Sequence, residues 1–420
     1  IKIPKGWTVV AYQDSNFRGK SITFTQSVAN LQSRKFNDVI SSVKITRPKR
    51  NPPVSSRFDK LKSPAPSGQV ALPLPSPVRP PPPPIKKINY LGQYPSDSDN
   101  NWSDNLQGVT HDESNWYFTQ MTKLWKFPFS HDLNKKLNGP NAAQQIYQVK
   151  IPSNLAKQGY NHFCDLDYYK GYLFVPIEGY KYVYVESQKK PSPFFKPLPP
   201  QRKKQNLTPL MLVYKASNLQ YIGSYKMTKQ TNAGWCAIHH QSQILYTSSS
   251  SISHSSNARK IHRYRIDFNS LKQGKVVLTF KDYYNLYNES GSKTQDIKKY
   301  MQGGDFSEDG KYLFLVNGRD SNDTKAKDGG VWVFHNDTGR KFTKSFSENS
   351  DFNSANNTKT SVNSTFKYEY HPGWSKYEEP EGITVGNLGA YKIKGEIHVI
   401  MLDNDASNDE LYFKHYEVVR

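Results

Sequence analysis

Eight acidic and histidine residues lie near the starts of short, similar segments, where side chains from separate parts of the chain can meet. They are Asp104, His111, His162, Asp165, His239, Asp305, Glu379 and Glu381. Two carboxylates that flank a glycosidic bond can hydrolyse it, and a cluster of acidic and histidine side chains can also hold one metal ion. The same side chains can instead satisfy the backbone groups of buried strands. The residue types leave all three uses open.

These segments belong to a pattern that occurs five times between residues 88 and 420. Each copy has an inner segment, a turn and an aromatic strand, and the inner segments open at Gln107, Cys164, Cys236, Gly304 and Glu381. Radial repetition of such units is how β-propellers limit exposed strand edges. The repeats predict a β-propeller over 88–420, with five blades favoured and six as the alternative. The run KINYLGQYP before the first copy is expected to add the outer strand of the last blade and close the ring.

The segment EPEGI, which runs from Glu379 to Ile383, resembles a strand opening of lactonase-like and phytase-like propellers. The glutamate before the glycine can be a calcium ligand there, so the resemblance implies a metal-binding role for Glu381. No nucleophile motif such as Gly-x-Ser-x-Gly accompanies it. We therefore favour a binding or structural propeller and assign no catalytic residue. A propeller glycoside hydrolase or lactonase-like hydrolase, with a metal or carboxylates in the central channel, is the alternative.

The composition of the 420-residue chain favours strands. Only 35% of the residues are hydrophobic while 13% are aromatic, including 28 Tyr, which suits half-buried strands better than Leu-rich helices. An all-β fold is expected, with short helices at most near 271–274 and 294–301, and loops at 319–329 and 348–365. No apolar run is long enough for a membrane span.

The net charge of +21 is concentrated in two places. Residues 1–87 carry 16 Lys or Arg and three Asp, giving +13, and residues 188–204 carry six cations and no acid, giving +6. The remainder is 21 − 13 − 6 = +2, so the predicted propeller is otherwise nearly neutral. Such basic segments attract anionic polysaccharide, membrane surface or nucleic acid through a general field. Nucleic acid ranks low, because no recognition motif accompanies the charge.

Two motifs in the first 47 residues resemble the Greek key of the βγ-crystallins. Tyr12, Phe17 and Gly19 match its aromatic corner and glycine, and the run from Asn37 to Ser42, NDVISS, matches its calcium motif. The resemblance implies a Greek key over 1–47 with calcium ligands at Asn37, Asp38, Val39 and Ser41. Calcium prefers such oxygen ligands. The alternative is a plain turn whose short polar side chains bond their own backbone.

A βγ-crystallin domain resembles a pair of Greek keys, whereas this chain carries one. A lone key leaves an apolar sheet face uncovered, at a cost of about 25 cal/mol per Å². The cover must come from the propeller, another protomer or a different protein. We favour another protomer, because the same pairing would complete the calcium site.

The segment 48–87 is basic and rich in proline, with five consecutive prolines from Pro80 to Pro84. Proline fixes φ and removes a donor, so this linker is expected to adopt polyproline II. A shorter segment that is also basic and rich in proline lies at 189–204. The linker can serve either as a docking or glycosylated stalk or as a passive tether.

Asn-x-Ser/Thr sequons and cysteines bear on the compartment. The sequons lie at Asn101, Asn206, Asn288, Asn322, Asn336, Asn356 and Asn363, and each accepts a glycan only in a secretory pathway. Cys164 and Cys236 are either two buried thiols or one bridge between neighbouring units. We expect an extracellular or cell-surface, secreted protein with a non-enzymatic structural, adhesion or assembly role. The expected partners are another protomer, bound through the Greek key, and a glycan or anionic polysaccharide. Calcium is the expected cofactor.

Overall fold

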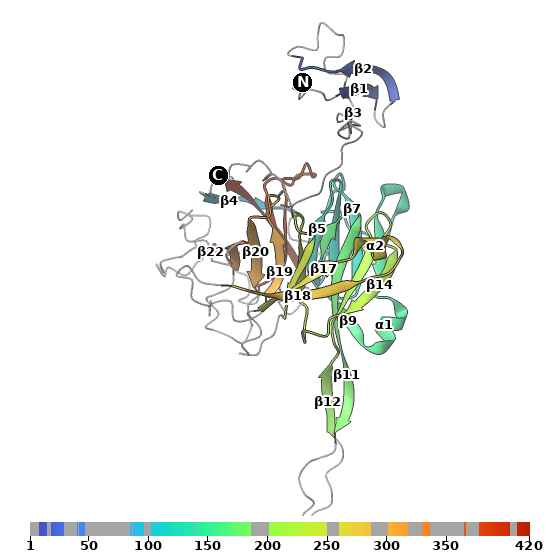
Figure 1. Cartoon of the computed structure of the whole chain (residues 1–420), viewed down its shortest axis with the longest axis vertical. Helices are drawn as coiled ribbons and strands as arrows, with labels where there is room; N and C mark the ends of the chain where they lie inside the picture. The colour runs from blue at the N-terminus through green and yellow to red at the C-terminus, as the bar shows by residue number, and fades with distance from the viewer. Residues whose placement is uncertain are drawn as a thin grey trace, which may run out of the picture. The chain divides into compact units, whose positions relative to one another are not determined.

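The computed structural model describes residues 8–14, 18–28, 40, 42–46, 85, 87–95, 102–137, 139–185, 201–249, 260–286, 301–317, 330–336, 365–366, 378–403 and 410–420. The chain divides into two compact units, Ile1–Pro80 and Pro81–Arg420 (Figure 1). Nearly all of the regular structure is strand, as the composition predicts.

The first unit contains an antiparallel sheet in the order β2-β1-β3. Its strands are β1 (Thr8–Asp14), β2 (Arg18–Phe24) and β3 (Ser42–Thr46). Val9, Ala11 and Phe24 form a small core, and Val9 lies opposite Phe24 in the register of β1 and β2. The predicted calcium ligands Asn37, Asp38, Val39 and Ser41 lie outside the described residues.

The second unit contains five antiparallel sheets among the described residues, four of them four-stranded and one six-stranded. Blade 1 is β5 (Leu106–His111), β6 (Asn115–Gln120), β7 (Lys123–Pro128) and β8 (Tyr147–Lys150). Blade 2 is β10 (Asp167–Tyr169), β11 (Tyr172–Val185), β13 (Leu210–Lys215) and β14 (Tyr221–Lys226), with β9 (Tyr160–Phe163) and β12 (Gln201–Asn206) also pairing with β11.

Blade 3 is β15 (Trp235–His239), β16 (Ile244–Ser248), β17 (Lys260–Ile266) and β18 (Leu278–Asn285). Blade 4 is β19 (Met301–Phe306), β20 (Tyr312–Asn317), β21 (Gly330–His335) and β22 (Thr365–Phe366). Blade 5 is β23 (Glu378–Val385), β24 (Ile397–Asp403), β25 (Glu410–Val419) and β4 (Lys87–Gln93).

The inner strands of the five blades form a closed ring. β5 contacts β10, β10 contacts β15, β15 contacts β19, β19 contacts β23, and β23 returns to β5. The ring closes by the predicted route, because β4 pairs with β25 and places Tyr90 opposite Tyr416. The prediction of an all-β propeller is confirmed, and the described residues form five blades.

The apolar cores lie between neighbouring blades, because successive side chains of a strand point to opposite faces. In β6, Trp116 and Phe118 pack against blade 5, whereas Tyr117, between them in sequence, packs against blade 2. Each blade is thus buried on both faces, which explains why its strands read as almost continuous apolar and aromatic runs.

Two short α-helices lie between strands. α2 (Phe268–Lys272) overlaps the predicted helix at 271–274, and Asp267 caps its N-terminus. α1 (Ser153–Gln158) was not predicted. The predicted helix at 294–301 is outside the described residues except for Met301, which begins β19 instead. Among the described helices, none has the length and hydropathy that a membrane crossing requires.

Candidate functional site

The carboxyl group of Asp165 lies where the inner strands come together. Oδ1 accepts a hydrogen bond from the backbone N–H of Val109 in blade 1 (3.0 Å), and Oδ2 accepts one from Gly304 in blade 4 (3.1 Å). The backbone of Asp165 also bonds to Gly234 and Cys236, at the start of blade 3. Burial raises the pKa of this carboxyl well above its usual range. Asp165 therefore connects three other blades to its own.

Glycines surround the Asp165 carboxyl. A Cβ on Gly382 would lie 2.8 Å from Asp165 Oδ1 and 2.8 Å from Gly108 Cα, and a Cβ on Gly108 would overlap the Asp165 backbone. Gly303 has a similar contact, 2.9 Å, with Asp165 Oδ2. The strands approach one another closely only because these positions lack side chains. The axis is filled at this level.

A bulge precedes each of these glycines. The strand registers skip one residue before Gly108, Gly303 and Gly382, and the extra residues are Gln107, Gln302 and Glu381. A bulge re-aims a side chain and bends its strand. The fourth copy of the sequence pattern therefore begins at Gln302 in the structure, two residues before the predicted opening at Gly304.

Asp167 repeats the role of Asp165 two residues further along blade 2. Its Oδ1 accepts from Thr110 Oγ1 of blade 1 (3.3 Å), and its Oδ2 accepts from the Ile238 N–H of blade 3 (2.6 Å). Burial, followed by the nearby carboxylate of Asp305, raises its pKa well above the usual range. Asp167 is not among the channel residues predicted from the sequence. Its signal was the Asp-x-Asp spacing, which places both carboxyl groups on one face of an extended strand.

Asp305 connects blade 4 to blade 5. Its Oδ2 accepts from the Val385 N–H (2.7 Å) and from Thr384 Oγ1 (3.2 Å), while Oδ1 accepts from the Phe306 N–H (2.6 Å). Burial raises the pKa of this carboxyl to about 7. Together, the carboxyl groups of Asp165, Asp167 and Asp305 accept at least one hydrogen bond from the inner strand of every blade.

A pocket of about 430 Å³ opens where the inner strands end. Asp167 and Asp305 line it, as do the aromatic residues Phe129, Tyr168 and Phe306. Residues at the strand ends and in the connecting turns also line it: His111, Asp112, Glu113, His240, Ser307, Glu308, Asn387, Leu388 and Gly389. We call these residues the pocket face.

Polar side chains near the starts of the inner strands pair with one another instead. His162 Nε2 lies 2.6 Å from Gln107 Oε1, and the Gln302 amide donates to the Glu381 carboxylate. Glu178 accepts from the Ala233 N–H (2.6 Å) and the Asn232 amide (3.2 Å). Burial lowers the pKa of His162 although Glu178 opposes this shift. Gln107, His162, Glu178, Gln302 and Glu381 form what we call the start face.

The structure divides the eight predicted channel residues among several places. Asp165 is on the axis, His111 and Asp305 line the pocket, and His162 and Glu381 belong to the start face. His239 turns toward the β19–β20 turn, where Nε2 lies 3.1 Å from the Gly310 carbonyl oxygen. The Asp104 carbonyl accepts from Gln120, and Glu379 lies in β23 opposite Leu402. They do not converge on one centre.

No group of three or more His, Cys, Asp or Glu side chains suited to a metal ion occurs within the described ranges. Glu381, the propeller residue with an implied calcium role, is buried and bonded to Gln302. Its metal-binding role stays a prediction.

Cys164 and Cys236 are both buried free thiols, so the alternative without a bridge is the one observed. Burial raises both thiol pKa values well above their usual range. Two of the sequon asparagines are described. Asn206 is exposed at the end of β12, whereas Asn336 is half-buried and its Nδ2 donates to the Gly310 carbonyl (3.0 Å). The sequons Asn101, Asn288, Asn322, Asn356 and Asn363 lie outside the described residues.

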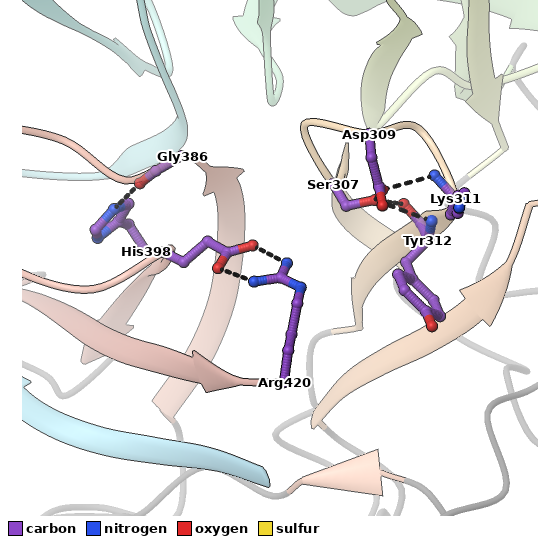
Figure 2. A network of polar contacts seen from close by, with 8 residues as sticks. Ser307, Asp309, Lys311, Tyr312, Gly386, His398 and Arg420 are labelled. Carbon is purple, nitrogen blue, oxygen red and sulfur yellow. Dashed lines mark hydrogen bonds and ion pairs between the residues drawn. The ribbon is translucent and has the colours of Figure 1, made fainter. Parts of the chain in front are cut away.

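Polar contacts hold the turns beside the pocket face (Figure 2). Ser307 Oγ donates to Asp309 (2.7 Å) and accepts from the Tyr312 N–H (3.0 Å) in the turn between β19 and β20. In blade 5, Arg420 forms a two-point ion pair with Glu396, while His398 Nε2 lies 3.0 Å from the Gly386 carbonyl oxygen. Gly386 directly precedes Asn387 of the pocket wall, so this network fixes the pocket's rim.

Comparison with known proteins identifies no family. No protein-family model matches the chain, and no curated protein matches it. A functionally unknown protein from Desulfotomaculum acetoxidans DSM 771 superposes with a TM-score of 0.33 at 11% identity, covering 74% of this chain and 69% of that one. The β-propeller domain of Cps50 (Swd1) from Myceliophteria thermophila gives 0.32 at 6% identity, covering 77% and 99%. KlAtg21, in complex with the coiled coil of AgAtg16, gives 0.30 at 9%, covering 75% and 71%.

Proposed function

We propose that this chain is an extracellular, non-enzymatic binding and assembly protein. Its propeller is the binding module, and its Greek key pairs with the Greek key of another protomer. One observation carries the non-enzymatic part: the channel carboxyls Asp165 and Asp167 accept hydrogen bonds from backbone N–H groups of other blades. Carboxyls used in this way hold the ring together and are poorly placed to exchange protons with a substrate.

The pocket face supplies the binding site of the proposal. Its half-buried rings, Phe129 and Tyr168, offer apolar faces, and the exposed side chains of Glu113 and Glu308 offer hydrogen-bond acceptors at the rim. Aromatic faces flanked by a few polar groups suit a sugar ring, which has apolar C–H faces and hydroxyl edges. We propose a neutral or weakly basic glycan as the ligand, because the rim acids would repel an anion.

Glycan binding is tested with immobilised oligosaccharides and the Tyr168→Ala variant. We expect the variant to lose at least tenfold in affinity, because the ring leaves the pocket wall. Tyr283→Ala is the matched control, since Tyr283 is a half-exposed tyrosine of β18 outside the pocket. Equal binding by both variants, or no bound oligosaccharide at all, would argue against this ligand class.

The assembly part rests on the small N-terminal sheet. The buried apolar core of its described residues is Val9, Ala11 and Phe24, and the β3 side chain of Val43 is 44% exposed. So small a core stabilises a sheet poorly by itself. We propose a βγ-crystallin-like key that pairs between protomers, with calcium held by Asn37, Asp38, Val39 and Ser41.

Sedimentation velocity of the full chain, with calcium and with a chelator, tests the assembly. We expect calcium to increase the fraction of dimer or larger species, and Asp38→Ala to abolish that increase. Asp59→Ala, in the linker, removes the same charge and should leave it unchanged. A strict monomer under both conditions would contradict the proposal.

A hydrolase is the second candidate, favoured by one feature of the pocket. Asp167 and Asp305 both line it, and a carboxyl with a pKa of about 7 suits a general acid. This candidate predicts turnover on a glycan or lactone panel that Asp305→Asn abolishes. Unchanged turnover in a variant that replaces Asp165, Asp305 and Glu381 together would end it.

A further inference from the structure

A two-stranded arm extends β11 beyond the edge of blade 2. β11 pairs with β13 only as far as Ile177, whereas residues 180–185 pair with residues 201–206 of β12 alone. Figure 1 shows the pair of strands projecting from the propeller. We call residues 180–185 and 201–206 the arm. A two-stranded ribbon adds little to the stability of a fold, so its length and composition call for another use.

One face of the arm alternates tyrosines with cations. Tyr182 lies directly opposite Lys204, and Tyr184 opposite Arg202, so their side chains share a face with Tyr180. The Arg202 guanidinium lies 3.6 Å from the centre of the Tyr182 ring, and Lys204 Nζ lies 4.0 Å from that of Tyr180. The tyrosine rings thereby hold both cations in place.

The arm is strongly basic and exposed. It carries Lys181, Arg202, Lys203 and Lys204 and no acidic residue. The ion pairs of the described residues, at Asp282 and Glu396, lie elsewhere in the propeller. Tyr182 and Tyr184 are 48% and 74% exposed although both are large aromatic side chains. Exposed aromatic groups beside uncompensated cations indicate a binding surface for an anion.

We propose that the arm binds an acidic polysaccharide, with carboxylate or sulfate groups at Arg202 and Lys204 and a sugar ring on Tyr184. Cations at alternate positions of a strand recur about every 6.6 Å, which suits a polymer whose charges also repeat. Single-stranded nucleic acid would need free ring faces for base stacking, but cations cover one face of Tyr180 and of Tyr182. This site is separate from the pocket and goes beyond the proposed function.

Lysine acetylation footprinting of the full chain tests the site directly. The probes are a heparin decasaccharide and an oligogalacturonide, which carry sulfate and carboxylate respectively, and a dT20 oligonucleotide serves as the nucleic-acid arm. We expect either saccharide to protect Lys204 at least fivefold. Lys181 and Lys203, on the opposite face of the arm, and the exposed lysines Lys215, Lys226 and Lys275 should keep their reactivity. This readout is independent of binding by the basic N-terminal region.

The matched variants are the triple substitution of Arg202, Lys203 and Lys204 by Gln and the triple substitution of Lys215, Lys226 and Lys275 by Gln. Both remove three positive charges. We expect the arm variant to bind the better saccharide at least tenfold more weakly and the control to stay within twofold, with equal thermal midpoints. Equal losses in both variants, an unprotected Lys204, or tighter binding of dT20 than of either saccharide would overturn the proposal.

Discussion

The two ends of the propeller channel use similar residues in different ways. On the start face, polar side chains pair with one another, as His162 does with Gln107 and Gln302 does with Glu381. On the pocket face, Asp167 and Asp305 bond to the backbone, and an open pocket lies above them. Between the two, Asp165 and the surrounding glycines fill the axis.

An acidic residue on an inner strand is therefore not by itself a sign of chemistry. What distinguishes the pocket face is open space lined by aromatic rings and exposed turn residues, rather than the number of its carboxyls. A carboxyl that accepts backbone hydrogen bonds from a neighbouring blade adds to ring stability first. Substitutions on the channel axis and on the pocket face can therefore separate effects on stability from effects on ligand binding.

The largest effect is expected for Asp165→Ala. The substitution leaves the buried N–H groups of Val109 and Gly304 without their acceptor, so we expect the free energy of unfolding to fall by about 3 to 5 kcal/mol. Asp165→Asn restores one acceptor and should lose roughly half as much. Urea unfolding of both variants measures the change. A loss below about 1 kcal/mol in Asp165→Ala would show that the axis carboxyl does not hold the ring.

Alanine at Gly108 tests the close approach of the strands, and the pocket face supplies its control. The new Cβ would overlap the Asp165 backbone, and relieving such overpacking costs about 3 kcal/mol. Gly389 lines the pocket and has nothing within 4 Å of an added Cβ, so Gly389→Ala should change stability by less than about 0.5 kcal/mol. Thermal unfolding measures both. Similar losses in the two variants would mean that the axis is no more tightly packed than the pocket.

Part of this organisation was predictable from the sequence. The repeated pattern of inner segment, turn and aromatic strand predicts the blades, and the run from Lys87 to Pro95 predicts the closing strand, because both can be read from contiguous stretches of sequence. The bulges at Gln107, Gln302 and Glu381 were not predictable, since a bulge shows only when two strands are paired. Asp167 was missed for a related reason: its partners, Thr110 and Ile238, belong to two other blades.

The pH dependence of stability tests the raised pKa of Asp305. Its folded pKa of about 7 exceeds the ordinary value of 3.8, so the folded state binds more protons between these values. Stability should therefore fall as the pH rises from about 4 to 7. Asp305→Asn should remove about 2 kcal/mol of that fall. The rest of the fall belongs to Asp167, because the two carboxyls interact and share their titration. Chemical unfolding at several pH values measures it, and an unchanged slope in the variant would contradict the assignment.

The smallest effect is expected for the buried histidine pair of blade 5, which acts in the opposite direction. His398 Nδ1 lies 3.0 Å from His415 Nδ1, and the Nε2 atoms face the carbonyls of Gly386 and Tyr94. Burial lowers the pKa of His415 to about 4, and burial together with His415 lowers that of His398. Below about 6.5 the unfolded chain binds more protons, so this pair makes stability fall as the pH drops toward 4.

The histidine pair and Asp305 thus oppose each other within one pH window, and single substitutions should separate them. His415→Gln should recover about 1 kcal/mol of the acid-side loss measured between pH 6.5 and 4, since the variant has no imidazole to protonate. The same variant should leave the Asp305 slope near neutrality unchanged. Because His398 holds the Gly386 carbonyl beside the pocket wall, ligand affinity measured in parallel shows whether the pair also supports the rim. A variant whose acid-side loss equals that of the parent chain would place this titration elsewhere in the molecule.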